Sequence, residues 1–160
     1  MHDTDARIRH FVDQMGVLTA RSGGSVTLGR IVGHMLICEP PDQSLSQIAD
    51  ALGISKASAS QLTRQLEQLR LLVRVPGRGR STAYRMPTGN WTEILREQIA
   101  LAHRFVDLAD QGLELVQGGA DRGERLTDLR GFYLEMAEEM TDFARRYEAR
   151  QPQSARRRSG

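Results

Sequence analysis

The chain has 160 residues, of which 39% are hydrophobic and 26% are charged. That length is sufficient for one buried hydrophobic core, and the composition excludes a disordered chain. The single cysteine, Cys38, excludes an internal disulfide framework and a cysteine-rich zinc or iron–sulfur centre. No run approaches the roughly 18 apolar residues of a membrane span, and the N-terminus lacks the apolar segment of a secretory signal. The sequence therefore predicts a soluble, cytoplasmic protein with no membrane contact.

Charge is distributed unevenly along the chain, although the formal net charge is only +2. Residues 1–43 carry a net charge of −1, residues 44–90 of +5, residues 91–150 of −5 and residues 151–160 of +3. Lys56 is the only lysine, so nearly all the cations are permanently charged guanidinium groups. This pattern indicates a polyanion-binding segment joined to one that does not bind polyanions, with random surface variation as the alternative.

Two helices are predicted before the basic segment. Residues 4–18 and residues 26–38 each place apolar side chains at steps of three and four, which is the spacing of one helical face. A pair of glycines separates the two helices, and a pair of prolines follows the second. Gly29 and Gly33 lie four positions apart in the second helix, so they leave room for another backbone to approach closely.

A helix-turn-helix is predicted at the start of the basic segment. Ser44 followed by Gln47 forms a capping-box pattern that starts a short helix, and Gly53 is typical of the position just after a helix. Ser55 is the expected N-cap of a second helix over residues 55–70. That helix is expected to bury its apolar side chains, namely Ala59, Leu62, Leu66 and Leu69. In DNA-binding proteins of this type, the second helix enters the major groove.

A β-hairpin is predicted directly after the second helix. Residues 71–75 and residues 82–86 are rich in apolar side chains, and the turn between them contains a proline, two glycines and two arginines. A hairpin in this position is the wing of a winged helix-turn-helix. Because arginine is favoured in a narrow minor groove, we expect the wing, residues 74–85, to contact the minor groove of DNA.

Two long helices are predicted over residues 91–117 and residues 121–150. The apolar side chains of the first cover an arc of roughly 200°, which is wider than the stripe of a helix with one buried face. The second has apolar residues at alternating steps of three and four, which is a heptad seam. A symmetric dimer would bury this apolar surface, and an intramolecular helical bundle is the alternative.

The predicted fold class is mainly α with a small β-wing, a winged helix-turn-helix followed by long C-terminal dimerisation helices. Four parts are expected along the chain. Residues 1–43 form N-terminal helices that contribute to the dimer and the core, and residues 44–90 form the DNA-binding domain. Residues 91–150 form a helical dimerisation arm, and residues 151–160 form a disordered basic tail.

The predicted DNA contacts are the polar side chains that remain exposed. In the recognition helix they are Ser55, Lys56, Ser58, Ser60, Gln61 and Arg64. Serine can bond base edges or phosphates, Gln61 can pair with adenine, and Lys56 or Arg64 can reach guanine or phosphate. In the wing they are Arg78 and Arg80 in the groove, flanked by Arg74 and Arg85 as phosphate clamps. The alternative is that these side chains only solvate the surface, but no acid occurs between residues 55 and 65.

The stretch from Leu45 to Tyr84, LSQIADALGISKASASQLTRQLEQLRLLVRVPGRGRSTAY, resembles the MarR-type winged helix-turn-helix regulators, and most closely their GbsR-like branch from high-GC bacteria. The resemblance implies a homodimeric transcriptional regulator whose terminal helices dimerise, and which a small effector often releases from DNA. In that family an acid in the wing turn can brace the wing arginine. Here the turn reads Arg78-Gly79-Arg80 without an acid, so a more mobile and more basic tip is expected.

Candidate sensing residues are few. Met35, Trp91, Phe105 and Phe132 could line an effector pocket between the long helix and the winged domain, and packing in the core is the alternative for each. Cys38 is expected to be a structural thiol, because the adjacent acid would raise its pKa. Cys38 lies four residues after a histidine, but two ligands are too few for a metal site. Neither a metal nor a cofactor is expected.

The sequence shows no nucleophile elbow, P-loop or metal triad, so an enzyme is not expected. The acids of the last helix lie mostly off its heptad seam, where solvent contact explains them. We therefore predict a homodimeric, sequence-specific DNA-binding transcriptional regulator, a repressor that a small-molecule effector releases. The alternative is a protein-interaction module with a winged-helix fold, which binds a protein partner rather than DNA.

Overall fold

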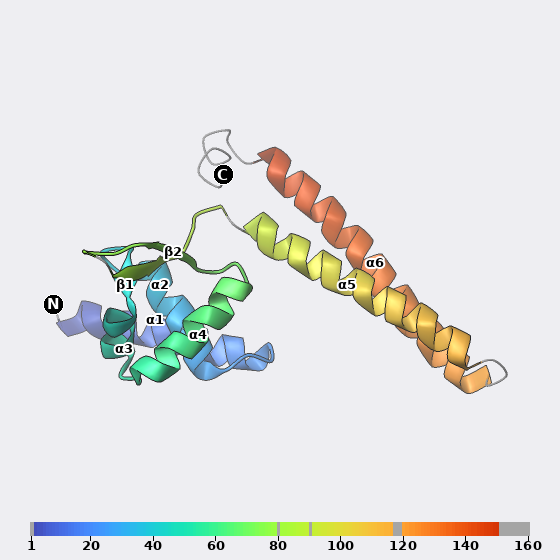
Figure 1. Cartoon of the computed structure of the whole chain (residues 1–160), viewed down its shortest axis with the longest axis horizontal. Helices are drawn as coiled ribbons and strands as arrows, with labels where there is room; N and C mark the ends of the chain where they lie inside the picture. The colour runs from blue at the N-terminus through green and yellow to red at the C-terminus, as the bar shows by residue number, and fades with distance from the viewer. Residues whose placement is uncertain (1, 80, 90, 117–119, 151–160) are drawn as a thin grey trace. The chain divides into compact units, whose positions relative to one another are not determined.

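The chain divides into two compact units, Met1–Thr88 and Gly89–Gly160. The first unit contains helices α1 to α4 and a three-stranded sheet, and the second contains helices α5 and α6 (Figure 1). The fold is thus mainly α-helical with one small antiparallel sheet, which confirms the predicted fold class. The computed structural model describes residues 2–79, 81–89, 91–116 and 120–150.

Helices α1 (His2–Arg21) and α2 (Val26–Ile37) form a closely packed pair. The side chain of Ser25 caps α2 by accepting a 3.1 Å hydrogen bond from the backbone N–H of Leu28. A Cβ on Gly29 would lie 2.5 Å from the backbone oxygen of Met15 on α1. The predicted close approach of another backbone to this glycine is therefore confirmed.

Helices α3 (Leu45–Leu52) and α4 (Lys56–Gln68) form the helix-turn-helix. Both bonds of the predicted capping box are present: the N–H of Ser44 donates to Oε1 of Gln47 over 2.8 Å, and the N–H of Gln47 donates to Oγ of Ser44 over 3.2 Å. Gly53 ends α3 with a left-handed φ of 64°, a conformation that glycine adopts without steric cost.

One buried cluster joins all four helices to the sheet. Its members are Val12, Leu28, Ile31, Val32, Met35, Ile48, Ala49, Leu52, Ala59, Leu66, Leu72 and Tyr84. The prediction that Leu69 belongs to this core is wrong, because 39% of its surface is exposed. Helix α4 ends at Gln68, and Arg70 adopts a positive φ of 60°, so Leu69 leaves the helical periodicity that would have buried it.

The predicted hairpin consists of β2 (Val73–Pro76) and β3 (Thr82–Arg85), which pair antiparallel. A third strand, β1 (Gln43–Ser44), pairs with β3 on its other side and gives the order β1-β3-β2. The sequence did not predict β1, because two residues are too few to show an alternating pattern. Strand β1 joins the wing directly to the start of α3.

Helices α5 (Trp91–Leu115) and α6 (Ala120–Arg150) lie side by side as a long hairpin (Figure 1). Small side chains are buried on both helices, namely Ala102, Val106 and Ala109 on α5 and Ala137 and Ala144 on α6. The guanidinium of Arg130 donates to Asp110 over 2.6 Å, and Arg96 pairs with Glu148 near the other end of the hairpin.

A leucine stripe on α5, defined as Leu101, Leu108 and Leu115, is left uncovered by α6, with exposed fractions of 45%, 60% and 85%. These positions recur every seven residues, so they share one face of the helix. Helix α6 therefore covers only part of the wide apolar arc that the sequence shows on this segment. Among the described residues, no helix has the length and apolar character needed to cross a membrane.

Candidate nucleic-acid interface

Helix α4 begins with a well-capped N-terminal turn. Oγ of Ser55 accepts a 3.1 Å hydrogen bond from the N–H of Ser58, which confirms the predicted N-cap. Lys56, Gln61 and Arg64 are exposed, as the sequence predicts. Ser58 and Ser60 are half-buried, so their hydroxyl groups are less accessible than expected. The first three turns of α4 therefore offer a cation, an amide and a second cation to a ligand.

The opposite side of α4 contains one polar residue in the core that the sequence analysis did not identify. Thr63 is fully buried, and its hydroxyl donates to the backbone oxygen of Ala59 over 2.8 Å. This bond satisfies the hydroxyl, so the residue can pack like an apolar side chain. The exposed side of the helix is therefore fixed by the burial of Ala59, Thr63 and Leu66.

The turn of the wing is closed by hydrogen bonds to backbone oxygens. The N–H of Gly77 donates to the oxygen of Ser81 over 2.9 Å, and the Ser81 hydroxyl donates to the oxygen of Arg78 over 2.7 Å. Gly79 has a left-handed φ of 68°. Arg80, the second predicted groove arginine, lies outside the described residues.

Arg78 lines a cleft between the wing and the start of α3, with a volume of about 550 Å³. The other lining residues include Asp42, Ser44 and Gln47 from the helix-turn-helix side and Ser81 and Ala83 from the wing. The capping box occupies the oxygen of Gln47, which leaves the amide NH2 group as a donor. Among the residues that the structure describes, Arg78 forms no ion pair.

The two predicted phosphate clamps are each bound to a carboxylate. Arg74 donates to both carboxylate oxygens of Glu67 on α4, over 2.7 and 3.1 Å, and this contact raises the pKa of Arg74. Arg85 binds both carboxylate oxygens of Asp42, and these hydrogen bonds lower the pKa of Asp42. A phosphate would have to share each guanidinium with its acid, which the sequence analysis did not foresee.

Arg74 and Arg85 project from opposite faces of the sheet. Arg74 is the cross-strand partner of Tyr84, so the two side chains share one face. Arg85 follows Tyr84 in the same strand and therefore points to the other face. The two arginines do not flank the wing on a common surface.

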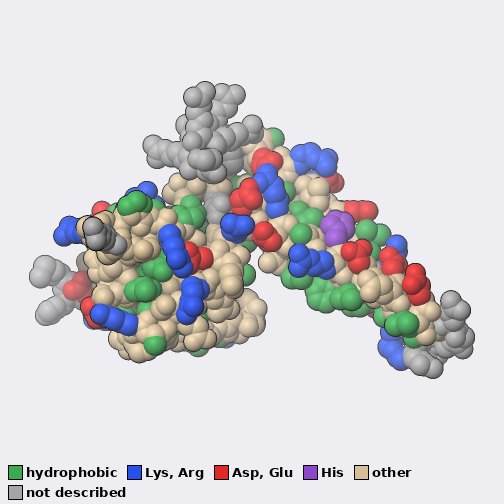
Figure 2. All heavy atoms as spheres, in the orientation of Figure 1, with side chains coloured by type: hydrophobic (Ala, Val, Ile, Leu, Met, Phe, Trp, Pro, Cys, Tyr) green, Lys and Arg blue, Asp and Glu red, His purple; other side chains and the backbone are tan. Residues whose placement is uncertain are grey.

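Basic side chains predominate on the visible face of the first unit, whereas acidic side chains are frequent along α5 and α6 (Figure 2). On α4 the one acid, Glu67, is partly buried and paired with Arg74. The surface offered by α4 and the wing is consequently cationic, and it suits a polyanion rather than a basic partner.

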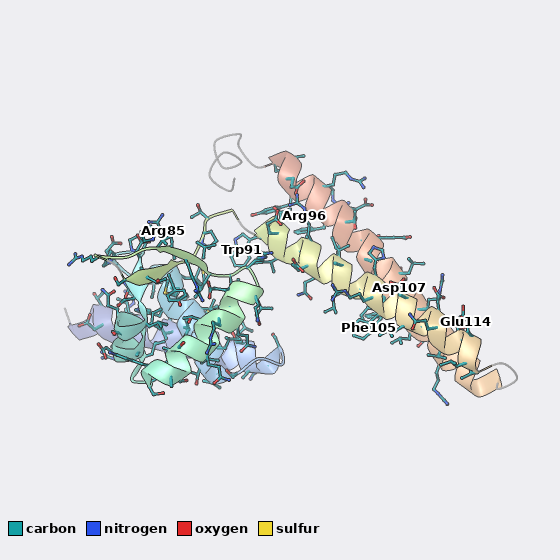
Figure 3. All side chains as sticks on the ribbon, viewed as in Figure 1. Arg85, Trp91, Arg96, Phe105, Asp107 and Glu114 are labelled. Carbon is teal, nitrogen blue, oxygen red and sulfur yellow. The ribbon has the colours of Figure 1, made fainter. Side chains whose placement is uncertain are left out.

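The predicted effector-binding residues differ in their exposure and in the side chains that they contact. Met35 is buried in the core of the first unit, with only 4% of its surface exposed. Trp91 is half exposed at the start of α5, and Phe105 lies further along that helix, where its ring stacks on Tyr133 at a centroid distance of 4.3 Å (Figure 3). Phe132 contacts Tyr133 edge to face and is largely exposed. The effector pocket stays a prediction.

Cys38 and His34 are both half-buried near the end of α2. Burial raises the pKa of the Cys38 thiol, and the charges of Glu39 and Asp42 act in the same direction. Burial lowers the pKa of His34, against a smaller opposite contribution from a hydrogen bond with Gln43. In the described part of the chain, no group of three or more potential metal ligands comes together.

Comparisons with known proteins agree on one class. Residues 89–150 match the family model of MmpR5-like MarR family transcriptional regulators, and residues 35–76 match the IclR helix-turn-helix domain. The chain is 32% identical to the HTH-type transcriptional regulator MmpR5 of Mycobacterium tuberculosis, over 89% of this chain and 88% of that protein. A crystal structure described as a transcriptional regulator superposes with a TM-score of 0.81 at 31% identity, covering 90% of this chain and 99% of the other.

Proposed function

This chain belongs to the MmpR5-like MarR family of transcriptional regulators, and from that premise we propose that it is a homodimeric repressor of a specific DNA operator. The observation that carries the proposal is the exposed side of α4, which presents Lys56, Gln61 and Arg64 and no unpaired acid. Such a surface suits the major groove, where an amide can read adenine and cations can bind guanine or phosphate. Membership of the GbsR-like branch stays a prediction.

The proposed DNA contacts combine base reading with electrostatic affinity. Lys56, Ser58, Ser60 and Gln61 read base edges, with Ser55 and Arg64 at the rim of the same helix surface. Arg78 and Arg80 on the wing supply sequence-independent affinity in the minor groove. Among the described arginines of the wing, a polyanion would gain more from Arg78 than from Arg74 or Arg85, because acids already bind the latter two.

The proposed dimer is formed through the leucine stripe. An exposed row of leucines this long is unfavourable in water, and a second copy related by a two-fold axis would cover it with the same row. The two recognition helices would then meet a pseudo-palindromic operator with half-sites about 34–36 Å apart, or a multiple of that distance. The negative charge of residues 91–150 keeps this arm away from DNA.

A small-molecule effector that releases the repressor is part of the proposal, on the strength of the family resemblance. Met35, Trp91 and Phe105 are the residues proposed to contact it. The site of action is the cytoplasm, because a regulator must reach the chromosome.

The deciding experiment measures fluorescence anisotropy of the purified protein on DNA from upstream of its own gene, at near-physiological salt. A scrambled duplex of equal composition is the control. We expect a preference of roughly 10³-fold or more for the specific duplex. Equal, weak binding to every fragment in a genome-wide selection would instead favour the alternative, a winged-helix module that binds a protein partner.

Replacing the wing arginines by Arg78→Ala and Arg80→Ala is expected to weaken binding to all DNA sequences alike. Each lost phosphate contact should reduce the slope of log affinity against log salt by roughly one unit. Titrations at four salt concentrations measure this slope. An unchanged slope would refute the assignment of the wing to DNA.

Gln61→Ala is expected to relax the preference at one base position, by about 1–3 kcal/mol, because the amide that pairs with adenine is lost. Binding to an operator set with every single-base change locates that position. Gln68→Ala, at an exposed site near the other end of α4, is the matched control and should leave the preference intact. Uniform weakening by Gln61→Ala on every duplex would exclude a reading role.

A further inference from the structure

An ion pair connects the wing to the segment that precedes the helix-turn-helix. Arg85 is the last residue of β3, and Asp42 immediately precedes β1. Arg85 donates from Nε to Oδ1 and from Nη2 to Oδ2 of Asp42, the second over 2.6 Å. The two residues are 43 positions apart in the sequence, so this contact exists only in the folded chain.

The ion pair extends a very short strand pairing by one step. Strand β1 contacts β3 through two residue pairs, Gln43 with Tyr84 and Ser44 with Ala83. Continuing that antiparallel register by one position sets Asp42 opposite Arg85. Opposite charges at directly facing positions stabilise an antiparallel pair. A two-residue strand is weak by itself, so the third, charged pair adds to the contacts that keep β1 against the wing.

The same pair determines the charge of the cleft. Asp42 lines that cleft together with Arg78, and both of its carboxylate oxygens are bonded to Arg85. Without Arg85, the carboxylate would lie uncompensated in the cleft that Arg78 also lines, and it would repel a phosphate there. Arg85 therefore acts on the DNA-binding surface without having to contact DNA.

We propose that Asp42 and Arg85 are positioning residues whose ion pair holds the wing against the start of α3 and so sets where Arg78 stands relative to α4. This inference rests on the proposed DNA-binding function. It assigns Arg85 to the support of the wing, in place of the phosphate clamp that the sequence predicted.

The test combines two charge-neutralising variants with a charge reversal, and it measures operator binding by the full-length protein. Asp42→Asn and Arg85→Gln are each expected to weaken operator binding roughly threefold to tenfold, above the effect of most exposed pairs because the geometry is bidentate. The salt slope should stay unchanged in both variants, since neither residue binds phosphate. The reversed pair, Asp42→Arg with Arg85→Asp, is expected to recover binding to within about twofold of the parent.

Amide hydrogen exchange supplies a second readout that does not depend on DNA. In Asp42→Asn the amides of residues 82–85 should exchange faster, while those of α4 should keep their parent rates. Asp13→Asn is the matched control, because it removes a carboxylate from the Arg30 ion pair between α1 and α2 in the same unit. This control should leave both the exchange of the wing and the operator affinity unchanged.

Two results would overturn the proposal. If Arg85→Gln lowers the salt slope by about one while Asp42→Asn binds DNA as tightly as the parent or more tightly, Arg85 contacts phosphate and Asp42 competes with it. If both single variants match the parent in affinity and in exchange, the pair positions nothing. A parent protein without operator preference would refute the proposed function instead, and the exchange experiment would still test the ion pair.

Discussion

Replacing Leu108 with glutamate is expected to convert the protein to monomers and to weaken operator binding by roughly 10²- to 10⁴-fold, the range lost when two linked sites become independent. Leu108 is the middle member of the leucine stripe and is 60% exposed in the single chain. In a two-fold interface the substitution occurs twice, so two carboxylates would be buried close to each other. Light scattering coupled to gel filtration measures the molar mass, and anisotropy measures the affinity.

The matched control is Ala100→Glu, which adds the same charge to the same helix. Residue 100 is exposed and lies about 80° around the helix from Leu108, at roughly 100° per residue. We expect this variant to remain dimeric and to bind the operator like the parent. Monomers from both variants would mean that added charge, rather than loss of the stripe, disrupts the assembly. A dimeric Leu108→Glu would place the interface elsewhere.

Gly29→Ala is expected to destabilise the first unit by about 1–3 kcal/mol, although alanine normally favours a helix over glycine. An added Cβ would lie 2.4 Å from Oγ1 of Thr19 and 2.5 Å from the backbone oxygen of Met15. The hydroxyl can rotate away, but the backbone oxygen cannot, so α1 and α2 must move apart. Urea unfolding followed by circular dichroism measures the change in the free energy of unfolding.

Gly131→Ala on α6 is the control with the opposite expectation. A Cβ at this position meets no described atom within 4 Å, so the helix should gain up to about 1 kcal/mol. The same chemical change therefore differs in sign between the two sites. If Gly29→Ala proved as stable as the parent, the close packing of α1 on α2 could not be a main support of the first unit.

Local signals account for most of the correct sequence predictions. The capping box at Ser44, the N-cap at Ser55 and the glycine after α3 were predicted because each acts on backbone groups within a few residues. The burial of Thr63 was missed, since a threonine reads as polar until its hydroxyl is seen to bond the preceding turn. Leu69 was misassigned because its helical spacing continues past the residue at which the helix ends.

For the candidate DNA-binding surface, too, some features could be predicted from the sequence and others could not. The cationic character of the second helix and of the wing follows from composition, and it needs no structure. Composition does not show which of these arginines are paired with acids. Arg74 and Arg85 have the same charge in the sequence as Arg78, yet acids bind the first two and none that the structure describes binds the third.

The sequence by itself determined the class of fold, the order of its helices and the segment that bears the positive charge, because helical periodicity, capping and charge are local properties of the chain. Only the tertiary structure decided the third strand, the cleft beside Arg78 and the pairing of Asp42 with Arg85. These features bring together groups some 40 residues apart. Such contacts depend on how distant segments pack against each other in the folded chain. Patterns among neighbouring residues do not predict that packing.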